Sequence, residues 1–315
     1  RLSRYEHMRV WENDPAHALT FDAAQLAAPE LGFIVEDGLL RSTLWSALGG
    51  ATVYAGAQAA GFHADEKAAR LELDNGMVLD AALVIAAEGA DSPLRAWADI
   101  EPAGWAYQQR AIVCHVRTQR PHQNTAYQRF LPGGPLAFLP LADGRSSIVW
   151  SAAEAEAAEL LGLSDDLFRA RLAQASGHSL GEITDSTQRL SFPLRLLHAQ
   201  DYVRPGLALV GDSAHVSHPL AGQGMNLGLA DVQALSETLA EARTQRRPFG
   251  KLRMLKRYER RRKADNLEML ALTDSLHRLF GSRSPAASGL REWGLALAGV
   301  IEPLKRELAR RAMGL

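Results

Sequence analysis

The chain has 315 residues, 47% of them hydrophobic and 23% charged, which is typical of a globular protein with room for two domains. The formal net charge of −1 gives no reason to expect a nucleic-acid partner, and the single cysteine, Cys114, excludes an intrachain disulfide and a cysteine-based metal cluster. No stretch approaches the roughly 20 apolar residues of a membrane-spanning helix. We therefore expect a cytoplasmic protein that holds no metal ion.

The first part of the chain predicts short strands and then a helix. The apolar runs 8–11 and 18–21 flank Glu12-Asn13-Asp14-Pro15, which is a typical turn sequence. Leucines at helical spacing then predict a helix over 36–48, with Asp37 as its N-cap.

Residues 51–87 alternate as short strands. Asp74-Asn75-Gly76 separates the strand-like runs 71–73 and 77–79, and this pattern predicts a hairpin. The continuous apolar run 82–87 predicts a fully buried parallel strand.

Residues 101–200 predict an antiparallel sheet with helices attached to it. Turn signals at 132–135 and 142–144 separate strand-like runs. A helical pair is expected over 152–175, with a break near Gly162 and a restart at Ser164. The predicted strands of this region are 111–117, 127–131, 136–141, 147–150 and 188–196.

The last third of the chain predicts one buried strand, 206–210, and several helices. The first helix covers 227–242, and the next, 251–263, carries eight basic residues and one acid. A basic amphipathic helix of this kind can touch anionic lipid, or it can pack on the protein with a solvated face. The segments 266–280 and 286–313 predict further helices that can pack on the core, on a partner or on a membrane surface.

The stretch from Gly211 to Asn226 connects the strand 206–210 to the helix that follows it. Asp212 stands at the strand end, where its carboxylate can accept hydrogen bonds from the hydroxyls of a ribose or ribityl chain. Gly222 and Gly224 allow close backbone approach to a ligand, and the helix N-terminus favours negative charge nearby. This pattern predicts the site of a large polar cofactor.

The sequence GDSAHVSHPLAGQGMNLGLADV resembles the second FAD signature of the flavoprotein aromatic hydroxylases, the p-hydroxybenzoate-hydroxylase-like family. Within that family it is most similar to the ubiquinone-biosynthesis hydroxylases. There the aspartate binds the ribityl or ribose part of FAD, and the Gly-Gln-Gly-x-Asn loop lies against the isoalloxazine ring. The resemblance implies cofactor contacts from Gly211, Asp212, Pro219, Gly222, Gln223, Gly224, Met225 and Asn226.

A second stretch, Glu88 to Arg95, resembles the family's third signature, Asp-Gly-x-x-Ser-x-x-Arg. The resemblance implies contacts with FAD and the nicotinamide donor from Glu88, Gly89 and Arg95, although Glu88 replaces the usual aspartate and reaches one methylene further. The structural alternative is a strand-end turn with Ser92 as a helix cap and Arg95 on the surface. Arg41 is the nearest match to a cofactor-contacting polar residue on a family helix, or else a solvated arginine.

The resemblance also implies a mixed α/β (α+β) fold, in which a partial Rossmann-like FAD-binding domain is interleaved with an antiparallel-sheet substrate domain. No Gly-x-Gly-x-x-Gly opens a βαβ unit, and the chain lacks an initiator methionine. We therefore expect a truncated form of a longer enzyme. The expected parts are the start of the substrate sheet at 1–35, FAD-binding segments at 36–100 and 201–250, the substrate sheet at 101–200, and C-terminal helices at 251–315.

The activity implied by the resemblance is that of an FAD- and NAD(P)H-dependent monooxygenase. The nicotinamide reduces FAD, O₂ then gives a flavin C4a-hydroperoxide, and its distal oxygen is transferred to an aromatic ring, here that of a polyprenylphenol. The loop residues His215 and His218 are candidates for proton transfer, or else are structural. The substrate pocket is expected to include Phe138, Leu139, Pro140 and Phe192, each of which also suits the core of a sheet.

Two other functions stay open from the sequence. A related flavoprotein would act on a soluble phenol or a polyketide. A non-enzymatic module would bind lipid or nucleic acid through the basic helix, with salt-sensitive affinity for polyanions. In the leading interpretation, the C-terminal helices contact a multi-enzyme complex or the periphery of the inner membrane.

Overall fold

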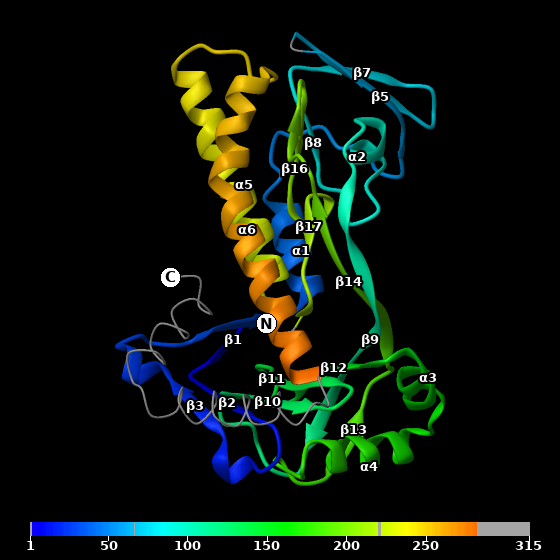
Figure 1. Cartoon of the computed structure of the whole chain (residues 1–315), viewed down its shortest axis with the longest axis vertical. Coiled ribbons are helices and arrows are strands. Elements are labelled where there is room, and N and C mark those ends of the chain that lie inside the picture. The colour runs from blue at the N-terminus through cyan, green and yellow to red at the C-terminus, as the bar shows by residue number, and fades with distance from the viewer. Residues whose placement is uncertain (1, 66, 220–221, 282–315) are drawn as a thin grey trace. The chain divides into compact units, whose positions relative to one another are not determined.

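The computed structural model describes residues 2–65, 67–219 and 222–281, which form several sheets and helices (Figure 1). The predicted helical segment 286–313 lies outside these residues. Within the described part, no helix is both long and apolar enough to cross a bilayer.

The chain folds into two compact units whose segments alternate along the sequence. The first unit comprises the described parts of Arg1–Ala51, Gln108–Leu194 and Leu276–Leu315. The second unit comprises Thr52–Tyr107 and Arg195–Ser275.

The first unit is built on a large mixed sheet. Its strands are β1 (Leu2–Tyr5), β2 (His7–Trp11), β3 (Leu19–Asp22), β4 (Gly32–Val35), β9 (Pro102–Thr118), β10 (Thr125–Leu131), β11 (Gly134–Pro140), β12 (Ser146–Ala153), β13 (Ile183–Ser186) and β14 (Leu190–Ala199). The order across the sheet is β17-β14-β9-β12-β11-β10-β2-β3, where β17 is His215–Val216, with β13 also paired to β9. Strands β1 and β4 form a separate two-stranded sheet. Both β9 and β14 continue from the first unit into the second.

The pairing of these strands is antiparallel wherever a local turn connects them. Strand β11 pairs antiparallel with β10 and β12, as the turn signals predict. Strand β12 also pairs antiparallel with β9, to which no local turn connects it. The strands β2 and β3, on either side of the predicted turn, also pair antiparallel. One pairing differs from the expected antiparallel sheet, because β2 lies parallel to β10, with Met8 opposite Ala126. No local turn signal can reveal this pairing, since the two strands are far apart in the sequence.

Two helices, α3 (Glu154–Gly162) and α4 (Asp165–Ala175), pack on this sheet. The other helices of the first unit are η1 (Pro15–His17), η2 (Ala23–Leu26) and α1 (Asp37–Ser46). The break between α3 and α4 is where the sequence predicts it, and Ser164 caps α4 by accepting a hydrogen bond from the N–H of Leu167 at 3.4 Å. Phe168 of α4 packs with Trp150 of β12 in the core of this unit.

The single cysteine belongs to the same core. Cys114 lies on β9 and is 3% exposed, which confirms that it is a buried strand residue. Burial raises the pKa of its thiol to about 12. The side chain therefore stays protonated and packs as a small apolar group.

Helix α1 confirms the predicted helix but not its cap. Glu36 occupies the N-cap position, and Asp37 lies in the first turn, where its Oδ2 is 2.8 Å from Nε of Arg41. An acid in the first turn that pairs with a base four residues later favours this arrangement. No residue of α1 is buried: Leu39 and Leu44 are exposed and Leu40 is half-buried.

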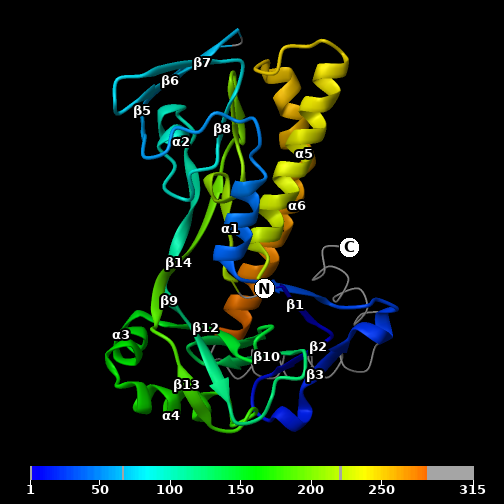
Figure 2. The ribbon, with the colours of Figure 1, turned by 180° about the vertical axis from the view of Figure 1, so that it is seen from behind.

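The second unit contains two three-stranded sheets. Its strands are β5 (Ala59–Ala64), β6 (Ala69–Leu73), β7 (Val78–Ala81), β8 (Val84–Ala86), β15 (Val203–Arg204), β16 (Leu207–Leu209) and β17 (His215–Val216). Its helices are α2 (Pro93–Trp97), η3 (Gly211–Ser213), α5 (Gly224–Thr244) and α6 (Leu252–Gly281), the last of which continues into the first unit. One sheet has the order β5-β6-β7 and lies beside α2 in both views (Figures 1 and 2). The other has the order β15-β16-β8.

The hairpin around Asp74-Asn75-Gly76 is confirmed, since β6 and β7 pair antiparallel on either side of it. Strand β8 is parallel to β16, as predicted, but the expectation of full burial is wrong, because Ile85 is 46% exposed. The reason is that β8 is an edge strand of its sheet among the described residues.

Helices α5 and α6 lie side by side against the β15-β16-β8 sheet (Figures 1 and 2). Ala234 and Leu235 of α5 share a core with Leu255 and Tyr258 of α6. The sequence predicts two helices over 251–280, but α6 is continuous. Its basic first half packs its apolar face on the protein, which is the second of the two alternatives left open for it.

Candidate functional site

Both candidate loops follow neighbouring parallel strands of the second unit. Strand β8 leads into the stretch 88–95 and β16 leads into 211–226, and Leu209 lies opposite Ala86 where the two strands pair. Because the carboxyl ends of neighbouring parallel strands meet at one edge of a sheet, the two loops start side by side. The fold therefore brings together the two motifs that the sequence separates.

A buried serine joins the two loops. Oγ of Ser213 accepts a hydrogen bond from the N–H of Gly89 at 3.1 Å and lies 3.3 Å from Oε2 of Glu88. Ser213 is fully buried, so these polar groups depend on one another for their hydrogen bonds. Ser213 lies within the quoted FAD signature, but the resemblance assigns it no contact.

Arg95 is a buried link between the loops, which differs from the surface position of the structural alternative. It is 7% exposed, and its guanidinium donates to the carbonyl oxygens of Ser213 at 2.9 Å and Ala90 at 2.8 Å. Burial lowers the pKa of Arg95, while the charges of Asp91 and Glu88 act in the opposite direction. Two backbone carbonyls thus hold this side chain inside the protein.

Glu88 turns back onto the start of α2. Its Oε1 accepts hydrogen bonds from the hydroxyl of Ser92 at 2.6 Å and from the N–H of Leu94 at 3.1 Å. Ser92 in turn accepts a hydrogen bond from the N–H of Arg95 at 3.0 Å, which confirms Ser92 as the helix cap. The longer side chain of Glu88 therefore stabilises the loop by hydrogen bonds within it.

Open space lies beside two glycines of these loops. Gly89 has φ +96° and Gly222 has φ +63°, and a Cβ at either position would have no neighbour within 4 Å. Asp212 is exposed at the head of the second loop. Backbone that a flat ligand can approach, in loops that also carry an exposed carboxylate able to accept hydrogen bonds from hydroxyls, fits FAD.

Helix α5 begins where the glycine-rich loop ends. It starts at Gly224 with Gln223 as N-cap and has no side-chain cap. Gln223 is buried and its Oε1 accepts a hydrogen bond from Nδ2 of Asn226 at 3.4 Å, whereas Met225 and Asn226 are exposed and Pro219 is half-buried. An uncapped helix start with exposed residues suits a ligand group that carries negative charge.

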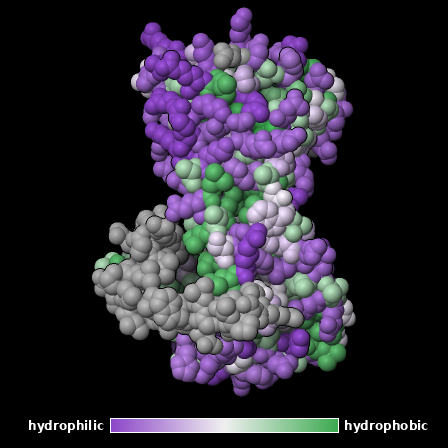
Figure 3. Space-filling model, in the orientation of Figure 1, coloured by the Kyte–Doolittle hydropathy of each residue, from purple (hydrophilic) through white to green (hydrophobic). Residues whose placement is uncertain are grey.

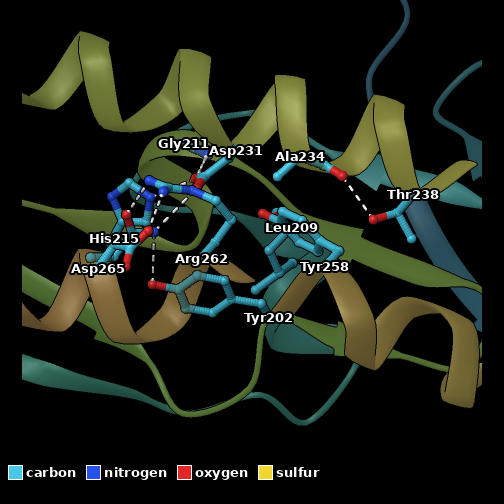
Figure 4. A network of polar contacts seen from close by, with 11 residues as sticks. Tyr202, Leu209, Gly211, His215, Asp231, Ala234, Thr238, Tyr258, Arg262 and Asp265 are labelled. Carbon is cyan, nitrogen blue, oxygen red and sulfur yellow. Dashed lines mark hydrogen bonds and ion pairs between the residues drawn. The ribbon is translucent and has the colours of Figure 1, made fainter. Parts of the chain in front are cut away.

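A buried network centred on Asp231 of α5 holds the start of the second loop (Figure 4). Oδ2 of Asp231 accepts a hydrogen bond from the N–H of Gly211 at 3.1 Å and lies 2.6 Å from Nε2 of His215. Oδ1 accepts hydrogen bonds from Nε of Arg262 at 2.9 Å and from Nδ2 of Asn266 at 3.1 Å. Residues of α5 and α6 thus fix the position of the turn that carries Asp212.

The charge of Asp231 is stabilised by its partners. Burial alone would raise the pKa of this carboxyl, but the hydrogen bond and charge of His215, followed by the bonds of Arg262 and Asn266, hold it below its usual value. Nε2 of His215 therefore contacts Asp231 and helps to hold the loop.

His218, the second candidate histidine, is also buried, and its ring lies edge-on to that of Tyr107 with centroids 5.0 Å apart.

Asp231 lies inside the quoted FAD-signature sequence, but the resemblance gives it no role, although a signal for one exists. Asp231 stands four residues after Leu227 and three before Ala234, in the stripe of α5 that is buried. A carboxylate within an apolar helical stripe needs partners in the core, and that feature could have identified it.

The other predicted site residues lie in the first unit. Arg41 is exposed on α1 and pairs with Asp37. Phe138 is 2% exposed within the sheet core, Pro140 is buried and Leu139 is half-buried on the same strand, and Phe192 is 53% exposed on β14. Across the described residues, no group of three or more histidine, cysteine, aspartate or glutamate side chains could hold a metal ion.

The chain matches a known protein family and several related proteins of known name. The family described as "FAD binding domain" matches residues 40–272. The 3-demethoxyubiquinol 3-hydroxylase of Escherichia coli is 38% identical over 318 residues, which covers 100% of this chain and 81% of the relative. The ubiquinone biosynthesis monooxygenase COQ6 of Homo sapiens is 31% identical over 354 residues, which covers 98% of this chain and 75% of the relative.

Solved structures show the same fold. The p-nitrophenol 4-monooxygenase PnpA of Pseudomonas putida superposes with a TM-score of 0.78 at 16% identity, over 99% of this chain and 82% of that one. HpxO of Klebsiella pneumoniae, solved with FAD and uric acid, superposes with a TM-score of 0.75 at 16% identity, over 99% of this chain and 80% of that one. From the family match and the curated relatives together, the chain belongs to the FAD-binding monooxygenase family that includes the hydroxylases of ubiquinone biosynthesis.

Proposed function

We propose that this FAD-dependent hydroxylase of the ubiquinone-biosynthesis family hydroxylates the ring of a polyprenylphenol, with NAD(P)H as reductant and O₂ as co-substrate. The curated relatives carry names of ubiquinone hydroxylases, and they support the substrate class. The single observation that carries the cofactor part is the pair of glycine turns with open space, at Gly89 and Gly222, in the two adjoining loops of which one also carries the exposed carboxylate of Asp212.

The chain's own residues would hold the cofactor. Asp212 would accept hydrogen bonds from ribityl or ribose hydroxyls, and the backbone at Gly89 and Gly222 would lie against the ligand. The start of α5, from Gly224 to Asn226, would favour the negative charge of a reduced ring. When bound, FAD supplies the redox chemistry that reduces O₂ and delivers an oxygen atom to the ring.

The two units would divide the work. The second unit carries both FAD-signature loops and would be the FAD-binding part, of Rossmann-like type. The sheet of the first unit would line the substrate pocket with the exposed Phe192 and half-buried Leu139, while the buried Phe138 and Pro140 would stiffen the same region. A prenylated substrate partitions into lipid, so the enzyme would work at a membrane surface.

The test is turnover with two kinds of substrate under ¹⁸O₂. The purified protein, loaded with FAD, is given NADH or NADPH and either a short-chain polyprenylphenol or a soluble phenol of the same ring pattern. The proposal expects one ¹⁸O atom in the prenylated product and a higher kcat/KM for that substrate. Flavin binding without hydroxylation of any phenol would overturn the monooxygenase assignment.

A second candidate is hydroxylation of a soluble phenol or a polyketide. Its support is the likeness in fold to PnpA and to the anhydrotetracycline hydroxylase OxyS of Streptomyces rimosus, which superposes with a TM-score of 0.72 at 20% identity. The same assay separates the two candidates, because a higher kcat/KM for the unprenylated ring favours the second.

A further inference from the structure

The basic residues of the chain are concentrated where α5 meets α6. Eleven of the 35 lysines and arginines lie within 243–263, and Glu259 is the only acid of that stretch. The whole chain has a net charge of −1, so this concentration is a strong local asymmetry. In Figure 3 the end of the second unit over this junction is covered by hydrophilic side chains.

A cavity of about 710 Å³ opens among these residues. Pro248 and Met254 are its apolar lining residues. The others all carry a positive charge, and no carboxylate lines the cavity. They are Arg247, Lys251, Arg253, Arg257 and Arg260.

The basic residues of this stretch divide by the side of the helix on which they lie. Those that face the protein have acidic partners: Lys256 binds Glu259 and Asp201, and Arg262 binds Asp231 and Asp265. In the cavity, Arg257 is paired with Glu241 at 2.6 Å. No ion pair or side-chain hydrogen bond to any described residue exists for the remaining cavity residues, which are Arg247, Lys251, Arg253 and Arg260.

The position of these charges on α6 is also unfavourable without a counter-ion. A helix N-terminus carries a partial positive charge and favours acids in its first turn. The first turn of α6 contains no acid; Arg253 stands in it, and Lys251 directly precedes the helix. Repulsion within the cluster adds to this cost, and a bound anion would remove both contributions.

We propose that this cavity is a binding site for a phosphate-bearing anion with two or more negative charges. Guanidinium groups bind phosphate oxygens in pairs of parallel hydrogen bonds, and four of the five cationic side chains are arginines. The volume exceeds that of a single phosphate group and suits a polyphosphate chain or the headgroup of an anionic phospholipid. Both share the same phosphate chemistry.

The site is separate from the cofactor loops and does not rest on the proposed function. The loops meet the first turn of α5, whereas the cavity begins after its last turn. With 21 residues, α5 spans about 30 Å between these two ends.

The experiment compares two double variants that remove the same charge from the same stretch. Arg253→Gln with Arg260→Gln removes two unpaired cavity residues. Arg243→Gln with Arg261→Gln, outside the cavity lining, is the matched control. All four side chains are exposed, so both variants are expected to fold, which urea unfolding checks.

Binding is measured at 150 mM NaCl with two probes. Calorimetry follows tripolyphosphate, and co-sedimentation follows phosphatidylcholine vesicles with and without phosphatidylglycerol. The site predicts that the cavity variant binds about tenfold or more weakly, while the control changes less than about twofold. Binding of tripolyphosphate but not vesicles identifies a soluble ligand, and binding of vesicles only when they contain phosphatidylglycerol identifies a lipid headgroup. An equal loss of affinity in both double variants, or no binding of either probe by the unmodified protein, would overturn the proposal.

Discussion

At the scale of single residues, the site depends on buried polar side chains that the FAD motifs contain without giving them this role. Arg95 and Ser213 each belong to one of the two motifs, yet in the structure they join the motifs to each other. Arg95 donates to backbone carbonyls, Ser213 bonds the backbone of Gly89 and the carboxylate of Glu88, and both side chains are buried. A side chain of this kind positions a loop whether or not it also touches the cofactor.

Replacement of Arg95 tests that role. Arg95→Met removes the donors to the carbonyls of Ser213 and Ala90, so we expect the free energy of unfolding to fall by about 2–4 kcal/mol, with weaker FAD binding. Urea unfolding with and without FAD measures both. Arg195→Met is the control, because the half-buried Arg195 pairs with the exposed Asp91 and its loss should cost less than about 1 kcal/mol. Equal losses would contradict a special role for Arg95.

Asp231 offers a second test with its control in the same network. Asp231→Asn removes the charge that pairs with Arg262 and His215 in a fully buried position, and we expect a loss of about 3 kcal/mol. Asp265 is the other acidic partner of Arg262, and its side chain is 65% exposed. Asp265→Asn should therefore lower the free energy of unfolding by less than about 1 kcal/mol. Chemical denaturation measures the free energy of unfolding of both variants. An Asp231→Asn protein as stable as the unmodified one would show that the network does not hold the turn.

At the scale of elements, the contact of α6 with β16 links the long helix to the strand that leads into the loop. The hydroxyl of Tyr258 on α6 donates to the carbonyl of Leu209 at 2.7 Å in the core. Tyr258→Phe leaves that carbonyl without its partner, so the unfolding free energy should fall by about 1–2 kcal/mol. Tyr54→Phe, at an exposed position, should change it by less than about 0.5 kcal/mol, and thermal unfolding compares the two.

The elements that the sequence predicts well are those with local signals. The hairpin at Asp74-Asn75-Gly76 and the break at Gly162 depend on turn and cap chemistry within a few residues. The parallel pairing of β2 with β10 and the edge position of β8 depend on partners distant in the sequence, so local patterns contain no information on them. The N-cap of α1 is predicted one residue late, because Asp37 pairs with Arg41 instead of capping a backbone N–H.

At the scale of the whole molecule, His198 makes stability depend on pH. His198 is 8% exposed, and burial, followed by the charges of Lys263 and His215, lowers its pKa to about 4. The unfolded chain takes up this proton near pH 6.5, so the neutral form contributes stability above that pH, and the contribution is lost as the pH falls through 6.5 towards 4.

A His198→Gln variant measures this effect. Between pH 7 and pH 5 the unmodified protein should lose about 2 kcal/mol more stability than the variant, which cannot titrate at this position. Urea unfolding of the FAD-free protein at the two pH values gives the difference. A parallel decline in both proteins would show that other groups cause the acid sensitivity.

The candidate site could be located in the sequence, but its supporting contacts could not. The glycine and aspartate positions around Asp212 and Gly222 form a contiguous pattern that the family resemblance identifies directly. The partners Arg262 and Asn266 lie on another helix, and only the packing of α6 on α5 brings them to Asp231. Glu88 replaces the usual aspartate of the motif. Its longer side chain lets the carboxylate bind the start of α2, and the family motif, which has the shorter residue, does not predict this contact.

The most direct test of the central claim is a titration of FAD, followed by quenching of flavin fluorescence. It uses this chain, the chain extended through any residues encoded before Arg1, and the variants Asp212→Asn and Asp185→Asn. We predict saturable binding that Asp212→Asn weakens by about tenfold, through loss of charge-assisted hydrogen bonds, while Asp185→Asn, at an exposed position of β13, has no effect. Absence of flavin binding by both chains, or equal affinity of the Asp212 variant, would contradict the account.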